Sequence, residues 1–514
     1  MTRAAPSAAA SAGLAVLAGL VFAASTPPLD FQPGILLGLA GFACAVKKST
    51  RPALAGFCFG LAANLLALRF VPEVMQRFTD LPAVLGWIAL ILLSAAQALP
   101  WAFGAWVGAY ARRVVPGWLA FGVTIYVATF VPAIFPWTPA GGLARWPILL
   151  QSAELVGERG TSFLVALGCG VIGTAVLARR WRPFALGAAV FAVLLGYGAL
   201  RMRAVDAARA GAPHAAVALI EPDFDATLRW DPDRAAMMLD RLTDATAKAE
   251  ADGADLTVWP ESAYPYTLVH GTRRAPSGMR SFFQAGVHGP ILTGAYLTKQ
   301  NGLGTNSAIL VRADGAIEPS YDKRHLLWFG ETVPLSDVFP VLRDVFARGT
   351  GLEPGTESVR FATGNVRAAV LNCYEDTLPA AGREAIAVRP NLLVNVTNDA
   401  WFSGSAEGEL HLRLATLRAV ELRRDLVRAV NRGPTTWVDA TGRVVERRTA
   451  PEGAGLVTLV AHPALLDGPP TLYARFGDAP LALLLIAALG LAALRVRATN
   501  AKRAPIPEGT TPAS

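Results

Sequence analysis

Cysteine and histidine are scarce in this sequence, and their scarcity excludes several kinds of site. The 514 residues include four cysteines and six histidines. Cys44, Cys58 and Cys169 lie in apolar segments, which leaves Cys373 as the one cysteine of the polar region. A disulfide within that region is therefore excluded. The histidines are scattered, without an HExxH pattern, so we expect no zinc site. We also expect no other metal and no diffusible cofactor, because the reaction predicted below requires none.

Charged residues are also few, at 17% of the chain against about 25% in soluble domains. The deficit is concentrated before about Leu200, where apolar segments alternate with short basic or proline-rich loops. A membrane-spanning helix needs about 20 apolar residues. Eight segments are candidates: those near 8–25, 34–46, 52–71, 83–111, 117–135, 160–178, 183–200 and 479–496.

Basic residues cluster at every second boundary between these apolar segments. The clusters are 47–51, 112–113, 179–182 and the C-terminal tail. Because basic loops stay in the cytoplasm, this pattern predicts a multi-pass protein of the bacterial inner membrane, with both termini cytoplasmic and the polar region in the periplasm. The net charge of +8 therefore does not indicate nucleic-acid binding. We predict four parts: a membrane domain of about seven helices (1–203), a periplasmic domain (204–470), a C-terminal transmembrane helix (471–497) and a cytoplasmic tail (498–514).

The polar region has the pattern of a layered α/β fold. Apolar runs such as "HAAVALIEP", "DLTVWPE", "VRAAVLN" and "NLLVNVTND" predict buried strands, and 232–251 and 407–424 predict helices. Strands that are apolar on both faces and alternate with helices favour an α/β arrangement with covered sheets. We interpret the arginines of 413–432 as a solvated helix face.

Three reactive side chains follow apolar strands. Glu261 ends "TVWPE", Lys323 lies in "YDKRH", and Cys373 ends "VLNC". A thiol with an ordinary pKa of about 8.5 needs a base, and a carboxylate can accept its proton. A lysine can stabilise a thiolate and then an oxyanion, and the backbone N–H of Tyr374 can complete an oxyanion hole. We therefore interpret Glu261 as the general base, Lys323 as the stabilising cation and Cys373 as the nucleophile.

These residues resemble the catalytic set of the nitrilase, or carbon–nitrogen hydrolase, superfamily, which is Glu, Lys and Cys in this chain order. "NVTNDAWF" (395–402) resembles that superfamily's Asn-Asp-x-Trp-Phe segment. Combined with the apolar segments, the chain resembles the apolipoprotein N-acyltransferase family. "YDKRHLLWFGETVPL" resembles its Lys-x-His-Leu-x-x-Phe-Gly-Glu motif, and "LRWDP" and "TNSAIL" stand where the family has Trp and Asn-Ser.

The resemblance implies a four-layer αββα nitrilase-like domain joined to a multi-span α-helical membrane domain. It implies an enzyme that moves an acyl chain from a membrane phospholipid, through a Cys373 thioester, to the diacylglyceryl-cysteine amine of an apolipoprotein. We expect a monomer. Besides the three catalytic residues, the expected site includes Glu331 as a supporting catalytic residue, Tyr374 and Glu375 around the oxyanion, and Trp230, Asn306, Trp328, Phe329 and Trp401 as substrate-binding residues.

Three segments depart from the family pattern, and two other function classes stay open. Gln-x-Asn is replaced by Glu221-Pro222-Asp223, Pro-Phe-Gly-Glu by the segment 328–331, and Asn-Thr-Gly-Ile-Ser by the segment 431–435. A membrane-anchored amidase or hydrolase could use the same three residues and pass the acyl group to water. A non-catalytic membrane scaffold is the third class, although the intact Glu, Lys and Cys argue against it.

Overall fold

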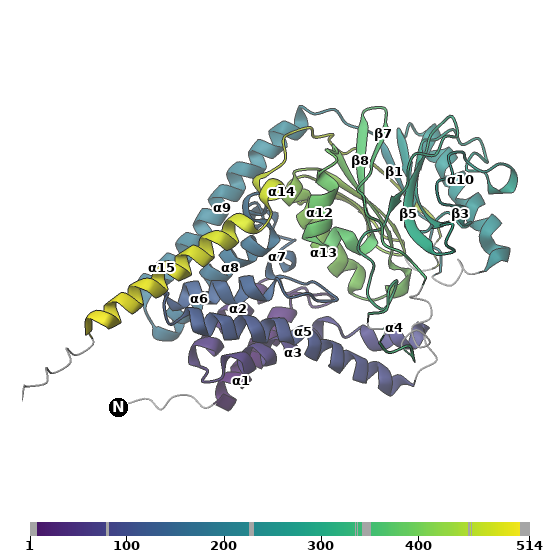
Figure 1. The fold of residues 1–514 in the computed structure, drawn as a ribbon. Helices are drawn as coiled ribbons and strands as arrows, with labels where there is room; N and C mark the ends of the chain where they lie inside the picture. The colour runs from purple at the N-terminus through teal and green to yellow at the C-terminus, as the bar shows by residue number, and fades with distance from the viewer. Residues whose placement is uncertain are drawn as a thin grey trace, which may run out of the picture.

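The N-terminal half of the chain is helical. The computed structural model describes residues 8–78, 82–225, 231–334, 336, 338–341, 351–450, 453 and 455–503. Figure 1 shows the helices gathered against one side of a strand-rich half. The N-terminal helices are α1 (Ala8–Ala23), α2 (Gly34–Lys48), α3 (Pro52–Ala67), α4 (Val71–Phe78), α5 (Ala83–Ala111), α6 (Gly117–Ala128), α7 (Pro139–Gly142), η1 (Pro147–Leu149), α8 (Ala153–Ala178) and α9 (Trp181–Ala210).

Each of the eight predicted apolar segments contains a helix, the last being α15 (Ala479–Arg503). In the described part of the chain, α5, α8, α9 and the 479–497 part of α15 are long and apolar enough to cross a membrane. Helices α3 and α4 form a fifth such unit if they are counted as one span, bent by 48°. Helices α1 and α6 are shorter apolar helices. A membrane protein is thus supported, and the count of eight spans stays a prediction.

The strand-rich half contains two sheets. One has the order β13-β1-β2-β4-β5-β6, with β3 paired to β4, and the other has the order β12-β11-β10-β9-β8-β7. In the first sheet β1 runs parallel to β2, and in the second β9 runs parallel to both β8 and β10. The strands are β1 (Val217–Glu221), β2 (Leu256–Val258), β3 (Leu268–Val269), β4 (Ile291–Thr298), β5 (Gly304–Val311), β6 (Tyr321–Asp322), β7 (Arg360–Thr363), β8 (Val366–Asn372), β9 (Leu392–Asn398), β10 (Leu426–Asn431), β11 (Thr435–Val438), β12 (Val444–Arg448) and β13 (Val457–Ala461).

The two sheets pack face to face, with helices outside both. Val258 of β2 and Leu310 of β5 share one core with Val370 of β8 and Val427 of β10. Outside the first sheet lies α10 (Ala235–Ala251), and outside the second lie α12 (Pro379–Ile386) and α13 (Glu407–Leu422). Because successive side chains of a strand point to opposite faces, apolar residues of these strands pack both between the sheets and under the outer helices. The four-layer αββα arrangement predicted from the sequence is confirmed.

Helix α13 also joins the strand-rich half to the helical half. Its Ala415 and Ala419 pack on the second sheet, whereas Leu417 and Val420 belong to the core of the N-terminal helices. The prediction of a solvated arginine face is wrong, because α13 is covered on both sides. The buried arginines are Arg413, Arg418, Arg423, Arg424 and Arg428.

Three of these arginines bind acidic residues of the helical half. Arg413 pairs with Asp30. Arg418 lies 2.7 Å from Glu158, and Arg423 lies 2.7 Å from Glu154. A buried charge is tolerated when it is paired and hydrogen-bonded. The arginines of α13 and of its C-cap therefore face acidic partners in the helical half rather than water.

Candidate active site

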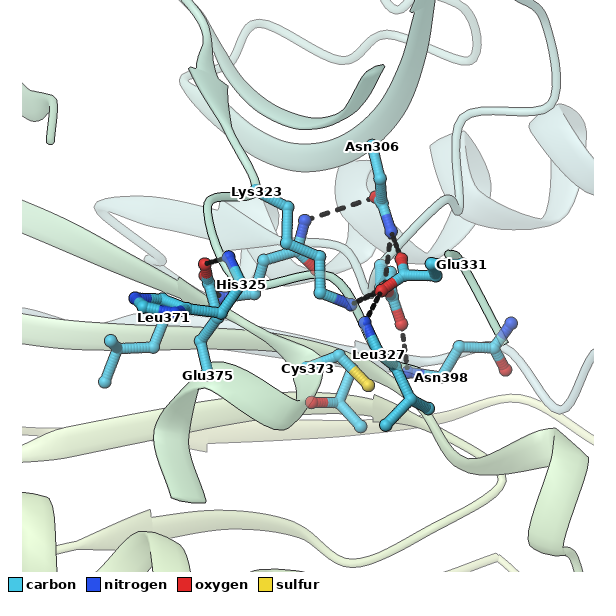
Figure 2. Close-up of polar contacts among 12 residues, drawn as sticks. Asn306, Lys323, His325, Leu327, Glu331, Leu371, Cys373, Glu375 and Asn398 are labelled. Carbon is cyan, nitrogen blue, oxygen red and sulfur yellow. Dashed lines mark hydrogen bonds and ion pairs between the residues drawn. The ribbon is translucent and has the colours of Figure 1, made fainter. Parts of the chain in front are cut away.

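The predicted catalytic side chains stand at the ends of strands from both sheets. Glu261 follows β2 and Lys323 follows β6 in one sheet, and Cys373 follows β8 in the other. The face-to-face packing of the sheets brings these strand ends together (Figure 2). Close approach at the Glu261 turn requires glycine in β4, because a Cβ on Gly294 would overlap the Ser262 backbone nitrogen.

Lys323 lies between two carboxylates. Its Nζ is 3.2 Å from Glu261 Oε1 and 2.7 Å from Glu331 Oε2, and the lysine is 1% exposed. Burial alone would lower the pKa of Lys323, but the two carboxylates raise it well above its ordinary value. The two carboxylates therefore favour the charged form of Lys323.

Asn306 connects the same two carboxylates. Its Nδ2 donates to Glu261 Oε1 at 2.7 Å and to Glu331 Oε1 at 2.6 Å, while its Oδ1 accepts from Asn372 Nδ2 at 3.2 Å. The amide is 1% exposed. These bonds occupy both N–H groups, so the geometry favours a positioning role for Asn306 over the substrate-binding role predicted from the sequence.

Sequence reasoning missed the residue that holds the other oxygen of Glu261. The backbone N–H of Asn398 donates to Glu261 Oε2 at 3.2 Å. A carboxylate has about four acceptor positions. Lys323, Asn306 and Asn398 fill three of them within the described chain, which leaves one on Oε2 for an incoming proton. The segment "NVTNDAWF" was recognised as a motif, but its sequence gives no sign that a main-chain group is the ligand.

Cys373 begins the turn η6 (Cys373–Thr377) in a left-handed conformation, with φ of 52°. A residue other than glycine adopts this conformation only where its surroundings enforce it. In Figure 2 its sulfur points toward the side of the site that holds the Lys323–Glu331 pair. Burial raises the pKa of the thiol well above its ordinary value, and the charge of Glu261 raises it further, against the opposite effect of Lys323. These surroundings therefore favour the neutral thiol form of Cys373.

Glu375 fixes the Cys373 turn to the Lys323 segment. Its Oε1 accepts from the backbone N–H groups of Arg324 and His325, at 2.8 and 3.0 Å. Its Oε2 accepts from the Tyr321 hydroxyl at 2.7 Å and from the Asn372 backbone N–H at 2.8 Å. The carboxyl group is fully buried. Glu375 therefore links the Cys373 turn to the Lys323 segment, and its expected place around the oxyanion stays a prediction.

The aromatic residues that were predicted to lie in the site differ in their exposure to solvent. Tyr374 and Trp401 are partly buried, whereas Trp328 and Phe329 are exposed by 49% and 39%. Trp230 lies outside the described residues. Their substrate-binding roles stay predictions.

A cavity of about 300 Å³ lies between the helical half and the nucleophile turn. Tyr374, His325 and Leu378 line it from the strand-rich half. From the helical half, the lining includes the aromatic residues Phe22, Trp101 and Trp137 and the polar residues Asn64, Gln97, Thr138, Glu158 and Arg159. The cavity therefore extends from a mixed aromatic and polar wall of the helical half to Tyr374, the residue after Cys373.

Two of the sequence departures meet in space. Arg432 Nε lies 2.8 Å from Asp223 Oδ1, and both residues have positive φ angles. Beside them Asn431 Nδ2 donates to Asn398 Oδ1 at 2.8 Å. The departures at 221–223 and 431–435 therefore each contribute one residue to the same ion pair, which lies near the segment that binds Glu261.

One group of described residues could hold a metal ion by composition: Asp399, Glu407 and His411. His411 Nε2 lies 2.8 Å from Asp376 and Nδ1 lies 3.3 Å from Asp399. Ion pairing between the imidazole and these carboxylates accounts for the arrangement.

A two-sheet α/β fold with Glu, Lys and Cys at converging strand ends defines the carbon–nitrogen hydrolase class, and residues 215–461 match the "Carbon-nitrogen hydrolase" family. Residues 18–171 match the "Apolipoprotein N-acyltransferase N-terminal domain". The chain is 31% identical over 522 residues to the apolipoprotein N-acyltransferase of Azotobacter vinelandii, covering 96% of this chain and 97% of that protein. For that of Geobacter metallireducens the identity is 30%, covering 90% and 91%. The chain belongs to the apolipoprotein N-acyltransferase family.

Among solved structures, the strand-rich half is similar to Nit3 of Saccharomyces cerevisiae, a member of branch 10 of the nitrilase superfamily. The sequence identity is 17%, the TM-score is 0.37, and the match covers 52% of this chain and 95% of that one.

Proposed function

We infer that this protein moves a fatty acyl chain from a membrane phospholipid, through a thioester on Cys373, to the N-terminal amine of a diacylglyceryl-cysteine on an apolipoprotein. The observation that carries the inference is the Glu261–Lys323–Glu331 cluster near Cys373, whose neighbour Tyr374 lines a cavity shared with the helical half. Family membership supports the reaction, and no metal or diffusible cofactor is needed for it.

The first half-reaction forms the acyl-enzyme. Glu261 accepts the thiol proton as Cys373 Sγ bonds to the carbonyl carbon of the phospholipid ester. Lys323 and the backbone N–H of Tyr374 stabilise the oxyanion. The carbon–oxygen bond then breaks, Glu261 returns the proton to the leaving oxygen, and a lysophospholipid departs.

The second half-reaction transfers the acyl group to nitrogen. The acceptor amine attacks the thioester carbonyl carbon, and Glu261 takes a proton from the attacking nitrogen. As the carbon–sulfur bond breaks, the proton returns to Sγ, which restores the neutral thiol. Glu331 and Asn306 hold the Lys323–Glu261 pair in place during both steps, because each binds a member of that pair.

Hydrolysis is the alternative outcome of the same acyl-enzyme. Water and an amine compete for the thioester, and exclusion of water at a lipid boundary favours the amine. The aromatic wall of the cavity and the family membership both favour acyl transfer over a membrane-anchored amidase.

We also propose the placement of the protein in the membrane. The alternating basic loops support cytoplasmic termini, a periplasmic catalytic domain (204–470) and seven helices before it, with the last helix and tail at 471–497 and 498–514. A monomer suffices for this reaction, because the described catalytic groups come from one chain.

The test is single-turnover transfer of a labelled acyl chain from a phospholipid to the purified protein. We expect wild-type protein to gain one acyl chain at Cys373, and to pass it to a diacylglyceryl-cysteine peptide on addition. Cys373→Ala and Glu261→Gln should gain none, and Cys373→Ser should be severely impaired because the hydroxyl pKa is much higher. Full labelling of Cys373→Ala would overturn the mechanism. Release of free fatty acid with no peptide product would favour the hydrolase.

A further inference from the structure

Two segments next to the proposed reacting groups carry buried carboxylates. Asp376 belongs to η6, three residues after Cys373. Asp399 directly follows Asn398, whose backbone N–H binds Glu261. The two carboxylates are 0% and 3% exposed. Each carboxylate therefore belongs to a segment that carries or binds a different proposed catalytic residue, Asp376 to the segment of Cys373 and Asp399 to the segment that binds Glu261.

His411 of α13 lies between these two carboxylates. Its Nε2 is 2.8 Å from Asp376 Oδ1, and its Nδ1 is 3.3 Å from Asp399 Oδ1. Since carboxylates only accept hydrogen bonds, both ring nitrogens are placed to donate. Burial alone would lower the pKa of His411, but Asp376 and Asp399 raise it well above its ordinary value.

We propose that His411 is a positioning residue that couples the nucleophile turn to the segment holding the base, and that its positive charge offsets Asp399 beside the Cys373 thiol. The proposal rests on Cys373 being the nucleophile. It assigns to α13, which also docks the domain on the membrane helices, a direct part in aligning the reaction centre.

The charged residues around His411 and Cys373 allow the electrostatic part of the proposal to be tested. His411 faces Asp376, Asp399, Glu407 and Arg428. Burial raises the pKa of the Cys373 thiol, the carboxylates Glu261, Asp399 and Glu331 raise it further, and Lys323 lowers it. Removal of the imidazolium leaves Asp399 uncompensated and disfavours the thiolate. Removal of the Asp399 charge has the opposite effect on the same thiol.

The experiment measures the rate at which iodoacetamide alkylates Cys373, followed by peptide mass spectrometry over a range of pH in the purified full-length protein. We expect the His411→Gln rate profile to move to higher pH and the Asp399→Asn profile to move to lower pH. The double variant, which removes one charge of each sign, should return toward the wild-type profile. A merely structural role would move both single variants the same way or neither.

Acyl transfer gives the second readout. We expect His411→Gln to lower kcat by on the order of 100-fold with little change in KM, the loss that a misplacement of about 1 Å produces. His288→Gln is the control, since that side chain is 86% exposed, and should match wild type. Unshifted alkylation in both single variants, or shifts in the same direction, overturns the proposal. If His411→Gln does not fold, the alkylation profile of Asp399→Asn decides the proposal, because that profile should still move to lower pH. Activity retained in Cys373→Ala would instead remove the proposed function.

Discussion

Breaking the Arg418 ion pairs should destabilise the contact between the strand-rich half and the helical half. Arg418 lies 2.7 Å from Glu158 of α8 and 3.1 Å from Glu421 of its own helix, and its side chain is 0% exposed. Arg418→Met leaves Glu158 without its cation inside the protein. Loss of one partner of a buried pair costs about 3–5 kcal/mol. At about 2–4 °C per kcal/mol for 150–250 residues, the melting temperature should fall by roughly 6–20 °C.

The assay is thermal unfolding of the purified protein in detergent, with two comparisons. Arg447→Met removes an ion pair to Glu409 whose arginine is 41% exposed. Such an exposed pair contributes about 0–1 kcal/mol, so this variant should melt close to wild type. Arg418→Met combined with Glu158→Gln removes one charge of each sign and should recover most of the loss. If Arg418→Met and Arg447→Met melt alike, the buried pair does not hold the two halves together.

Four further predictions concern the site, its pH response and its topology. Lys323→Met should block labelling of Cys373, because it removes oxyanion stabilisation of about 3–4 kcal/mol; normal labelling would remove the lysine from the mechanism. Glu331→Gln should slow labelling without abolishing it, since Glu261 still holds the lysine; a complete loss would indicate a direct chemical role. Burial raises the pKa of Glu221 from 4.5 to about 8, so its contribution to the free energy of unfolding is complete below about pH 4.5 and is lost as the pH rises through 8. The melting temperature of Glu221→Gln should therefore depend less on pH than that of wild type. An unchanged pH dependence would show that Glu221 does not cause it. Reporter fusions after Arg182 and near Gly253 should give opposite compartment signals, and equal signals would refute the predicted topology.

The candidate catalytic residues could be proposed from the sequence because their signal is local. Cys373 directly follows β8 and Glu261 comes three residues after β2, and a parallel strand end in a layered α/β fold is a usual place for reactive groups. The strands and helices of the polar region were also predictable, because burial on both faces leaves continuous apolar runs. Lys323 was found through its chain order and its motif.

The supporting contacts could not be found, because their partners are remote in the chain. Arg413 and Asp30 are 383 residues apart, and Arg418 and Glu158 are 260 apart. A helix with regularly placed arginines has the same local pattern whether water or a buried carboxylate faces it. Asn306 was predicted to bind substrate for a similar reason, since the sequence does not show that two carboxylates occupy its amide.

In the proposed reaction, the surroundings of Cys373 account for the use of one cysteine in two opposite steps. Burial and the nearby carboxylates Glu261 and Glu331 raise the thiol pKa, so a permanent thiolate is disfavoured. The neutral thiol loses its proton only as Sγ bonds to the acyl carbon, when the negative charge moves to the oxyanion. In the second step the sulfur must leave, and a group with a raised thiol pKa leaves best when it is protonated. Glu261, with one free acceptor position on Oε2, can serve both steps, because it takes the proton in one direction and returns it in the other.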